Sequence, residues 1–310
     1  MSGSDLKTFN IPFPVYNHTL PNFFINPDKN LSRYKHSILA FSHTPKSGGT
    51  TMKRCMKTVS ELSGKRSPLI VNGPSCISTR LALLTGKLRE EMIDSFAGSL
   101  LGICDHLKRK NCAYFTIMRD PYDRLISHYF FCKAGKQTFL SCENKTIVEF
   151  ARRVGSTVFT QLSAQFKCLR EREIGIQNET WRCYKKDFAY EPQSSERDLM
   201  LAYLVENLES LFAVIGLTEE FDFSLKLLQR TFGWSFFDKC KGEKFNVGSY
   251  FMNNSDSVSH SENWQKLKAR EIILDNEEIR DALYPDVVLY QRAKEIFQKE
   301  KEAFLKMNSL

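Results

Sequence analysis

The most restrictive feature of this sequence is a glycine loop between an apolar run and a helical stretch. Residues 37 to 41 read Ser-Ile-Leu-Ala-Phe, and Thr-Pro-Lys-Ser-Gly-Gly-Thr-Thr follows at residues 44 to 51. The apolar run predicts a buried strand, and residues 50 to 62 have helical spacing. Glycines let the backbone approach an anion closely, and the first turn of a helix offers unpaired N–H groups. Strand, loop and helix therefore predict an anion site, in which Lys46 supplies a mobile charge.

Two other interpretations of this loop bear on its function. A nucleoside triphosphatase loop places its lysine after the glycines, as G-x-x-x-x-G-K-[ST], and no segment has that spacing. An ordinary kinase-like function is therefore not favoured. The loop could also be a plain Gly-Gly turn capped by threonine, without any ligand.

A second segment repeats the same order of elements. Residues 113 to 118 predict a buried strand, and residues 122 to 131 predict a helix whose first position suits Pro121. Arg119, at the strand end, can fork onto a phosphate group. Ser127, two turns along the helix, can offer its hydroxyl to the same group. The sequence thus predicts two anion-binding elements at two strand ends.

A structural interpretation of the second segment remains open. Arg119 and Asp123 could form a surface ion pair. Arg124 and His128 are four residues apart, so they could cap a solvated helix face instead of supporting a site.

Alternating strands and helices predict an α/β fold with a P-loop-like, mostly parallel central sheet flanked by helices on both faces. A length of 310 residues, 42% of them hydrophobic, fits a single domain. We expect an irregular N-terminal arm over residues 1 to 35 and the domain over residues 36 to 310. The polar, cysteine-containing residues 132 to 192 predict an inserted, acceptor-facing region.

Further elements are expected in the second half of the chain. A strand is predicted at residues 211 to 216 and a loop at 240 to 262. Helices are predicted at residues 147 to 153, 160 to 169, 195 to 207, 221 to 232 and 276 to 306, the last of them broken near Pro285.

The nine cysteines lack paired C-x-x-C elements, so a zinc site is not expected. No histidine or carboxylate cluster has metal-ligand spacing, which predicts chemistry without a metal. Cys132 with Cys142, and Cys168 with Cys183, bracket short segments as disulfides would. Free buried cysteines are the alternative.

Five Asn-x-Ser/Thr sites favour a glycoprotein of the secretory lumen, at Asn17, Asn30, Asn144, Asn178 and Asn253. The sequence contains no apolar stretch of about 18 residues and no apolar run of signal-peptide length near Met1, so as written the chain is expected to be soluble. The two observations agree only if the chain lacks its native N-terminal anchor or leaves these sites unused.

The two anion-binding segments resemble those of the sulfotransferase family. In that family a P-K-[ST]-G-G-T-[ST] loop binds the 5′-phosphosulfate of 3′-phosphoadenosine 5′-phosphosulfate, and an R-D-P-x-x-R-x-x-S-x-Y segment binds the 3′-phosphate. Carried over by position, the resemblance implies that Arg119 and Ser127 hold the 3′-phosphate, and that the 5′ side is lined by Lys46, Ser47, Gly48, Gly49, Thr50 and Thr51. It extends over residues 38 to 298, through Phe212 to Glu220, Asn246-Val247-Gly248 and Leu289-Tyr290.

The spacing of these parts is most similar to the Golgi carbohydrate branch, including the uronyl 2-O-sulfotransferases. The chain departs from the cytosolic branch at Met52, where that branch has tryptophan, and matches its R-K-G segment only loosely at residues 239 to 242. Where uronyl enzymes have a Gly-His pair, this chain has residues 102 to 106, from Gly102 to His106.

The resemblance implies sulfuryl transfer, in which Lys46 steadies the leaving phosphate oxygen and a base removes the acceptor proton. Histidine suits the base because its ordinary pKa lies near neutrality. We expect His106 in this role, since it lies between an apolar run and the strand that ends at Arg119. Asp105, His43 or a distant glutamate are alternatives, and His106 could be an ordinary loop residue.

Carbohydrate is the expected acceptor, and small alcohols, phenols or sterols are the alternative. A third possibility is a nucleotide-binding module without catalysis. Basic residues at positions 108 to 110, 152, 153, 185 and 186 could hold an acidic glycan or could be solvated surface. The net charge of +8 attracts anions or merely favours solubility. No basic run is typical of nucleic-acid binding. The expected location is the Golgi lumen, with the cytoplasm as the alternative.

Overall fold

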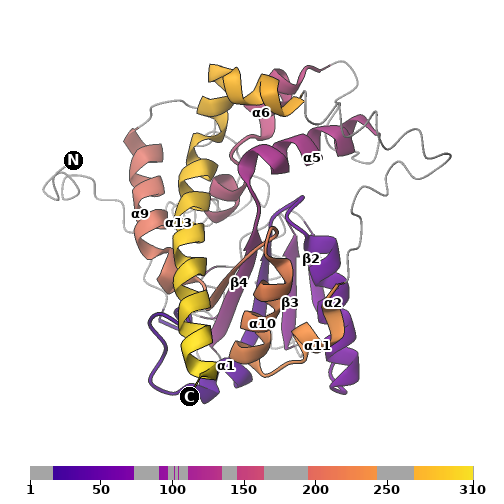
Figure 1. The fold of residues 1–310 in the computed structure, drawn as a ribbon, viewed down its shortest axis with the longest axis vertical. Coiled ribbons are helices and arrows are strands. Elements are labelled where there is room, and N and C mark those ends of the chain that lie inside the picture. Colours follow the sequence, from indigo (N-terminus) through magenta and orange to yellow (C-terminus); the bar gives the residue numbers. More distant parts are fainter. Residues whose placement is uncertain are drawn as a thin grey trace, which may run out of the picture.

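The computed structural model describes residues 17–72, 91–96, 101, 104, 111–134, 145–163, 195–242 and 269–309. Its centre is a five-stranded sheet in the order β2-β3-β1-β4-β5 (Figure 1). Every neighbouring pair is parallel, which confirms the predicted α/β class. The strands are β1 Ile38–His43, β2 Leu69–Asn72, β3 Met92–Phe96, β4 Cys112–Met118 and β5 Val214–Leu217.

The predicted helices are present in the described parts of the chain. The helices of the structure are α1 Ser32–His36, α2 Gly49–Leu62, α5 Pro121–Lys133, α6 Ile147–Val154, α9 Ser195–Leu211, α10 Phe221–Phe232, α11 Phe236–Cys240 and α13 Glu277–Asn308. Residues 157–163 and 269–275 are also helical. Of these, α1, α11 and the helix at residues 269–275 are additional ones that were not predicted. The strand expected from residue 211 begins only at Val214, because α9 continues to Leu211. Among the helices described, none combines the length and apolarity that a membrane span requires.

Both faces of the sheet are covered, as the alternation of side chains along β1 shows. Phe41 stacks on Phe115 of β4, with ring centroids 4.8 Å apart, and Phe115 contacts Phe232 and Phe236 on the α10 and α11 side. Successive residues of a strand point to opposite faces. Ser42 therefore faces the other way, where its hydroxyl accepts a hydrogen bond from Gln161 in the helix at residues 157–163.

A second apolar cluster supports the upper end of the domain. Side chains of α5, α6, the helix at residues 269–275 and the first half of α13 form it, including Leu125, Phe150, Ile273 and Leu283. The described part of the predicted insertion thus packs against α5 and α13. Residues 135 to 144 and 164 to 192 of that insertion lie outside the described residues.

The predicted break of the last helix near Pro285 is wrong. The helix runs without interruption from Glu277 to Asn308, with Pro285 inside it. A proline removes one hydrogen bond from the helix interior. Here tertiary packing outweighs that loss, because the first half of α13 lies in the second cluster and Asp286, directly after the proline, is anchored to Arg124.

The described part of the N-terminal arm contributes to the main core. Leu20, Phe23, Phe24 and Tyr34 are all buried in it, and Thr19 pairs with Cys112 as an isolated parallel bridge. Asn22 donates a hydrogen bond to Glu300 of α13. The boundary placed at residue 36 stays a prediction, although these aromatic side chains pack within the domain.

Glu300 makes stability depend on pH in a defined direction. It is fully buried, one oxygen accepts the Asn22 amide and the Ile215 N–H, and burial raises its pKa to about 8. Between its ordinary pKa and about 8, the folded protein retains a proton that the unfolded chain releases. The free energy of unfolding therefore falls as pH rises through this window, with a limiting slope of about 1.4 kcal/mol per pH unit.

Urea unfolding at pH 5, 6, 7 and 8 measures this dependence against Glu300→Gln, which keeps an oxygen for both donors. We expect the wild-type stability to fall relative to that of the variant across the series. Parallel pH profiles would contradict the assignment of the effect to Glu300.

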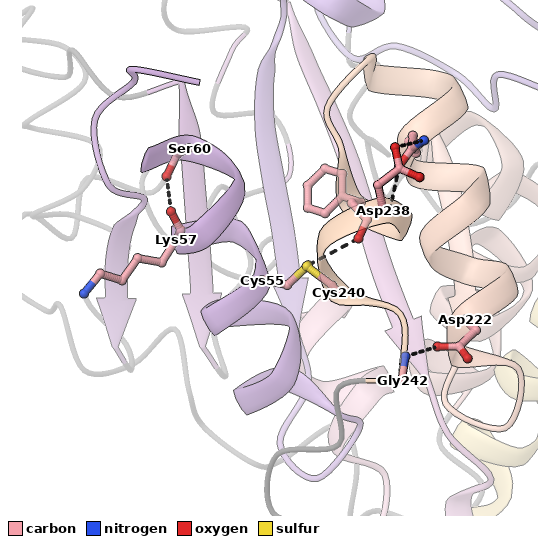
Figure 2. The surroundings of a disulfide bond; sticks show 9 residues. Cys55, Lys57, Ser60, Asp222, Asp238, Cys240 and Gly242 are labelled. Atoms are coloured by element: carbon pink, nitrogen blue, oxygen red, sulfur yellow. Dashed lines mark hydrogen bonds between the residues drawn. A yellow bond between two sulfur atoms is a disulfide. The ribbon is translucent and has the colours of Figure 1, made fainter. Parts of the chain in front are cut away.

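The described residues contain one long-range and one short-range disulfide. Cys55 of α2 is bonded to Cys240 of α11 across 185 residues (Figure 2). Cys104 is bonded to Cys112, eight residues further along the chain. In the chain-entropy interpretation, the Cys55–Cys240 cross-link over so long a loop stabilises the fold by about 5 kcal/mol. Cys132 is also disulfide-bonded. The expected partner Cys142, and the pair Cys168 and Cys183, lie outside the described residues, so those pairings stay predictions.

Candidate functional site

The predicted site residues gather at the carboxyl edge of the sheet. The loop at residues 44 to 51 follows β1, Arg119 follows β4, and Thr218 follows β5. These three strands are neighbours in the sheet, so their ends lie side by side. In open α/β sheets this edge is where ligands bind.

The glycine loop has an uncapped helix start. Lys46 and Gly48 both have left-handed backbone angles, with φ of 68° and 74°, and α2 begins directly after them at Gly49. Gly48 has no side chain with which to cap α2. The first N–H groups of a helix have no partner within the helix, so this end of α2 is of the kind that binds anions. The Ser47 hydroxyl is buried and has no hydrogen-bond partner among the described residues. The loop thus presents donors suited to an anion.

Arg119 connects the second predicted element to this loop. Its guanidinium donates a hydrogen bond to the Lys46 carbonyl, with a nitrogen to oxygen distance of 3.2 Å. The Lys46 ammonium lies 3.9 Å from the centre of the Phe131 ring on α5. Phe131 and Ser127 are four residues apart, so they share one face of that helix. Lys46, Arg119 and the Ser127 face of α5 therefore lie close together, and their roles in donor binding stay a prediction.

The turn that carries Arg119 is fixed by its neighbours. Asp120 caps α5 by accepting the N–H groups of Tyr122 and Asp123, and its own N–H donates to Glu219 at 2.9 Å. Tyr290 of α13 hydrogen-bonds to Glu219. Burial makes the largest contribution to raising the pKa of this tyrosine, and the Glu219 and Asp120 carboxylates raise it further. Glu219 thereby ties α13 to the turn after β4.

Arg124 and His128 do not cap a solvated helix face, so that alternative for the second segment is wrong. Both side chains are buried, Arg124 completely. Arg124 donates to Asp286 at 3.0 Å and also to the Gly155 carbonyl. Asp123 forms its ion pair with Arg270 at 2.6 Å instead of with Arg119.

A histidine–aspartate pair lies beneath the glycine loop. His43, at the end of β1, is within 2.8 Å of Asp94 on the adjacent strand β3, and the imidazole stacks on Phe41. The other ring nitrogen lies only 1.6 Å from where a β-carbon on Gly49 would be, so only glycine fits at the start of α2. Nothing in the local sequence indicated Asp94, because its partner is 51 residues away.

Replacing Gly49 with alanine is expected to lower the free energy of unfolding by about 1 to 3 kcal/mol, because the added methyl group overlaps the His43 ring. Urea unfolding measures the loss. The double variant His43→Ala/Gly49→Ala is the control, since it removes the obstructing ring. We expect it to be no less stable than His43→Ala alone, and fully additive losses would contradict this contact.

Gln161 is a further site residue that the sequence did not reveal. Its side-chain oxygen accepts a hydrogen bond from the Thr44 hydroxyl at 2.9 Å, and its amide donates to Ser42 at 3.4 Å. Gln161 thereby joins the start of the loop to the helix at residues 157–163. The only signal for it is a buried polar residue between Phe159 and Leu162, two apolar core residues.

Several predicted functional residues fall outside the described part of the chain. They include the expected base His106, its alternative Asp105, the basic residues 108 to 110, 185 and 186, and Asn246-Val247-Gly248. Of the basic residues described, Arg152 is exposed and pairs with Glu278. The described residues contain no group of three or more histidine, cysteine, aspartate or glutamate side chains that could hold a metal. Metal-independent chemistry stays a prediction.

The chain is an α/β protein whose glycine loop, at the carboxyl edge of a parallel sheet, has the geometry of an anion site. Comparison with protein families matches the chain to the sulfotransferase family over residues 29–291. The chain belongs to this family, whose members are transferases of sulfuryl groups. A comparison with curated proteins found no match. The narrower resemblance to the uronyl 2-O branch stays a prediction.

Proposed function

We propose that this protein transfers a sulfuryl group from 3′-phosphoadenosine 5′-phosphosulfate to a hydroxyl group of a carbohydrate. The observation that carries the proposal is the hydrogen bond from Arg119 to the Lys46 carbonyl. It brings the two predicted phosphate-binding elements to one edge of the sheet. A donor with phosphate groups at both its 3′ and 5′ positions needs two such elements.

In this proposal the two ends of the donor take different partners. The N–H groups at residues 48 to 51, the Ser47 hydroxyl and the threonine hydroxyls hold the 5′-phosphosulfate. Arg119 and Ser127 hold the 3′-phosphate. The buried, unpartnered Ser47 hydroxyl supports this fit, because a buried polar atom without a partner is costly unless a ligand satisfies it.

The proposed reaction is an in-line displacement at sulfur. The acceptor oxygen forms a bond to sulfur as the bond from sulfur to the 5′-phosphate oxygen breaks, and 3′-phosphoadenosine 5′-phosphate leaves. Lys46 stabilises the negative charge that develops on the leaving oxygen. A base accepts the proton of the acceptor hydroxyl.

His106 is proposed as this base because it precedes the strand that ends at Arg119. His43 suits the role less well, since its side chain is buried, faces Asp94 and packs against Gly49. Kinetics of His106→Ala test the assignment. Turnover should collapse while binding of 3′-phosphoadenosine 5′-phosphate is retained, and unchanged turnover would remove His106 from the mechanism.

A carbohydrate acceptor is supported by signs of the secretory pathway. Disulfides form and persist in oxidising compartments. The described glycosylation sites Asn17 and Asn30 are exposed, as an attached glycan would require. We place the protein in the Golgi lumen, a compartment of the secretory pathway in which disulfides and attached glycans are both expected. The net charge of +8 suits an acidic glycan acceptor.

The test is transfer of radioactive sulfate from the labelled donor to a panel of acceptors. The panel contains glycosaminoglycan chains, neutral oligosaccharides, a phenol and a sterol, with Lys46→Ala as the inactive control. We expect label on the glycosaminoglycans. Label on the phenol or sterol alone would overturn the carbohydrate acceptor but keep the transferase. Donor-product binding without any transfer would instead indicate a nucleotide-binding module.

A further inference from the structure

A pocket of about 540 Å³ lies away from the sheet edge that carries the glycine loop. In Figure 1, α1 and the C-terminus lie at the end of the domain opposite to α5 and α6. The pocket is formed there by α1, α10, α11 and the last turns of α13. Its lining residues are Lys35, Lys226, Gln229, Arg230, Gly233, Phe237, Phe304 and Asn308.

The pocket is strongly basic. Lys35, Lys226 and Arg230 line it, no carboxylate does so among the described lining residues, and none of these three cations forms an ion pair within the described chain. One carboxylate lies beside the pocket: Asp238 of α11 accepts a hydrogen bond from the amide of the lining residue Gln229 at 2.9 Å. Three cations against this one carboxylate leave an excess of positive charge, which favours an anionic ligand.

Aromatic rings make part of the pocket wall apolar. Phe237 and Phe304 are half-buried in its wall. The ammonium groups of Lys226 and Lys241 lie 4.8 and 5.5 Å from the centre of the Phe237 ring. The Lys35 side chain packs against the end of α10, where its carbons lie 3.4 to 3.6 Å from the position of a β-carbon added to Gly233, an ordinary van der Waals contact. Cations and apolar rings thus share one concave surface.

We propose that this pocket binds an acidic saccharide unit, carrying sulfate or carboxylate groups, as a second site for the acceptor polysaccharide. The cations match the anionic groups, and the phenylalanine rings match the apolar face of a sugar ring. The proposal rests on the proposed function in one respect only, namely that the acceptor is an acidic polysaccharide.

The pocket is separate from the transfer site. Phe221, at the start of α10, lies against Gly48 of the loop, whereas Arg230 and Gly233 at the other end of α10 line the pocket. The 12 residues of α10 span roughly 18 Å. A bound donor therefore does not compete for the pocket. A long acceptor that occupies the pocket raises its own effective concentration at the transfer site.

The first test is calorimetric titration of a fully sulfated heparin hexasaccharide into the protein saturated with 3′-phosphoadenosine 5′-phosphate. The pocket variant is Lys35→Ala/Lys226→Ala/Arg230→Ala. The control variant is Lys57→Ala/Lys65→Ala/Lys294→Ala, which removes the same charge from exposed sites elsewhere. We expect the pocket variant to bind about tenfold more weakly or worse, and the control to bind within about twofold of wild type.

Equal losses in both variants, or no loss in either, would overturn the proposal. Thermal unfolding checks that the pocket variant is folded, and the single variant Arg230→Gln gives the same comparison with a smaller perturbation. Phosphatidylserine vesicles form a separate arm. Binding of the vesicles that depends on the three cations, without binding of the hexasaccharide, would assign the pocket to a membrane surface and overturn the saccharide proposal.

A kinetic arm distinguishes this proposal from the proposed function. With a long glycosaminoglycan acceptor the pocket variant should show a raised KM and an unchanged kcat. With a short oligosaccharide acceptor both KM and kcat should equal those of the wild type. If no glycosaminoglycan is sulfated but binding of the hexasaccharide still depends on the pocket cations, the proposed acceptor is wrong. The pocket is then a site for acidic saccharides, and its role as a second acceptor site is overturned. If sulfation proceeds and the KM of the long acceptor is unchanged, the pocket proposal is wrong and the function stands.

Discussion

Replacing Lys46 with alanine is expected to lower the rate of sulfuryl transfer by about 100- to 1000-fold. The negative charge on the leaving phosphate oxygen grows as the bond to sulfur breaks, and a positioned ammonium stabilises that charge more in the transition state than in the bound donor. The loss should therefore fall mainly on kcat. Steady-state kinetics with labelled donor measure it.

The structure makes this substitution a clean one. Arg119 binds the main-chain carbonyl of Lys46, so truncating the side chain leaves that contact in place. The variant removes the ammonium group, which lies over the Phe131 ring. Lys46→Arg retains the charge and serves as the matched control, with an expected intermediate rate. If the alanine variant keeps a rate within about threefold of wild type, Lys46 does not stabilise the leaving oxygen.

Replacing Asp286 with alanine is expected to lower the free energy of unfolding by about 3 to 5 kcal/mol. Asp286 is buried, and it accepts hydrogen bonds from Arg124 at 3.0 Å and from the Val158 and Phe159 N–H groups at 3.1 and 2.8 Å. Burial raises the pKa of Asp286, and the Arg124 charge opposes that rise. Alanine leaves a completely buried guanidinium without its counter-ion.

The matched control removes both charges at once. Replacing Arg124 with methionine and Asp286 with leucine leaves no uncompensated buried charge, so the double variant should be more stable than Asp286→Ala. Urea unfolding of the wild type and the two variants gives the comparison. A loss below about 1 kcal/mol in Asp286→Ala would show that this pair does not hold α5, α13 and the helix at residues 157–163 together.

Local signals were enough to predict the elements that carry the site. The apolar run before Lys46, the glycines after it and Pro121 at the start of α5 each act within a few residues. A parallel sheet then places neighbouring strand ends together, so the convergence of Lys46 and Arg119 could be predicted as well.

The supporting contacts could not be predicted because their partners are remote in sequence. Arg124 resembled a surface residue until its partner Asp286, 162 positions away, was known. Cys55 and Cys240 are separated by 185 residues, and spacing alone favours short pairings such as Cys132 with Cys142. Pro285 predicted a break in α13, whereas packing on both sides of it keeps the helix continuous. In each case tertiary packing overrides a local signal.

Calorimetric titration of 3′-phosphoadenosine 5′-phosphate into wild type, Lys46→Ala and Arg119→Ala tests most directly whether the two elements form one donor site. We predict binding of one nucleotide by the wild type and affinity weakened about tenfold or more in each variant, because each loses a charged hydrogen-bond donor to phosphate. Unchanged affinity in both variants would contradict a donor site at Lys46 and Arg119.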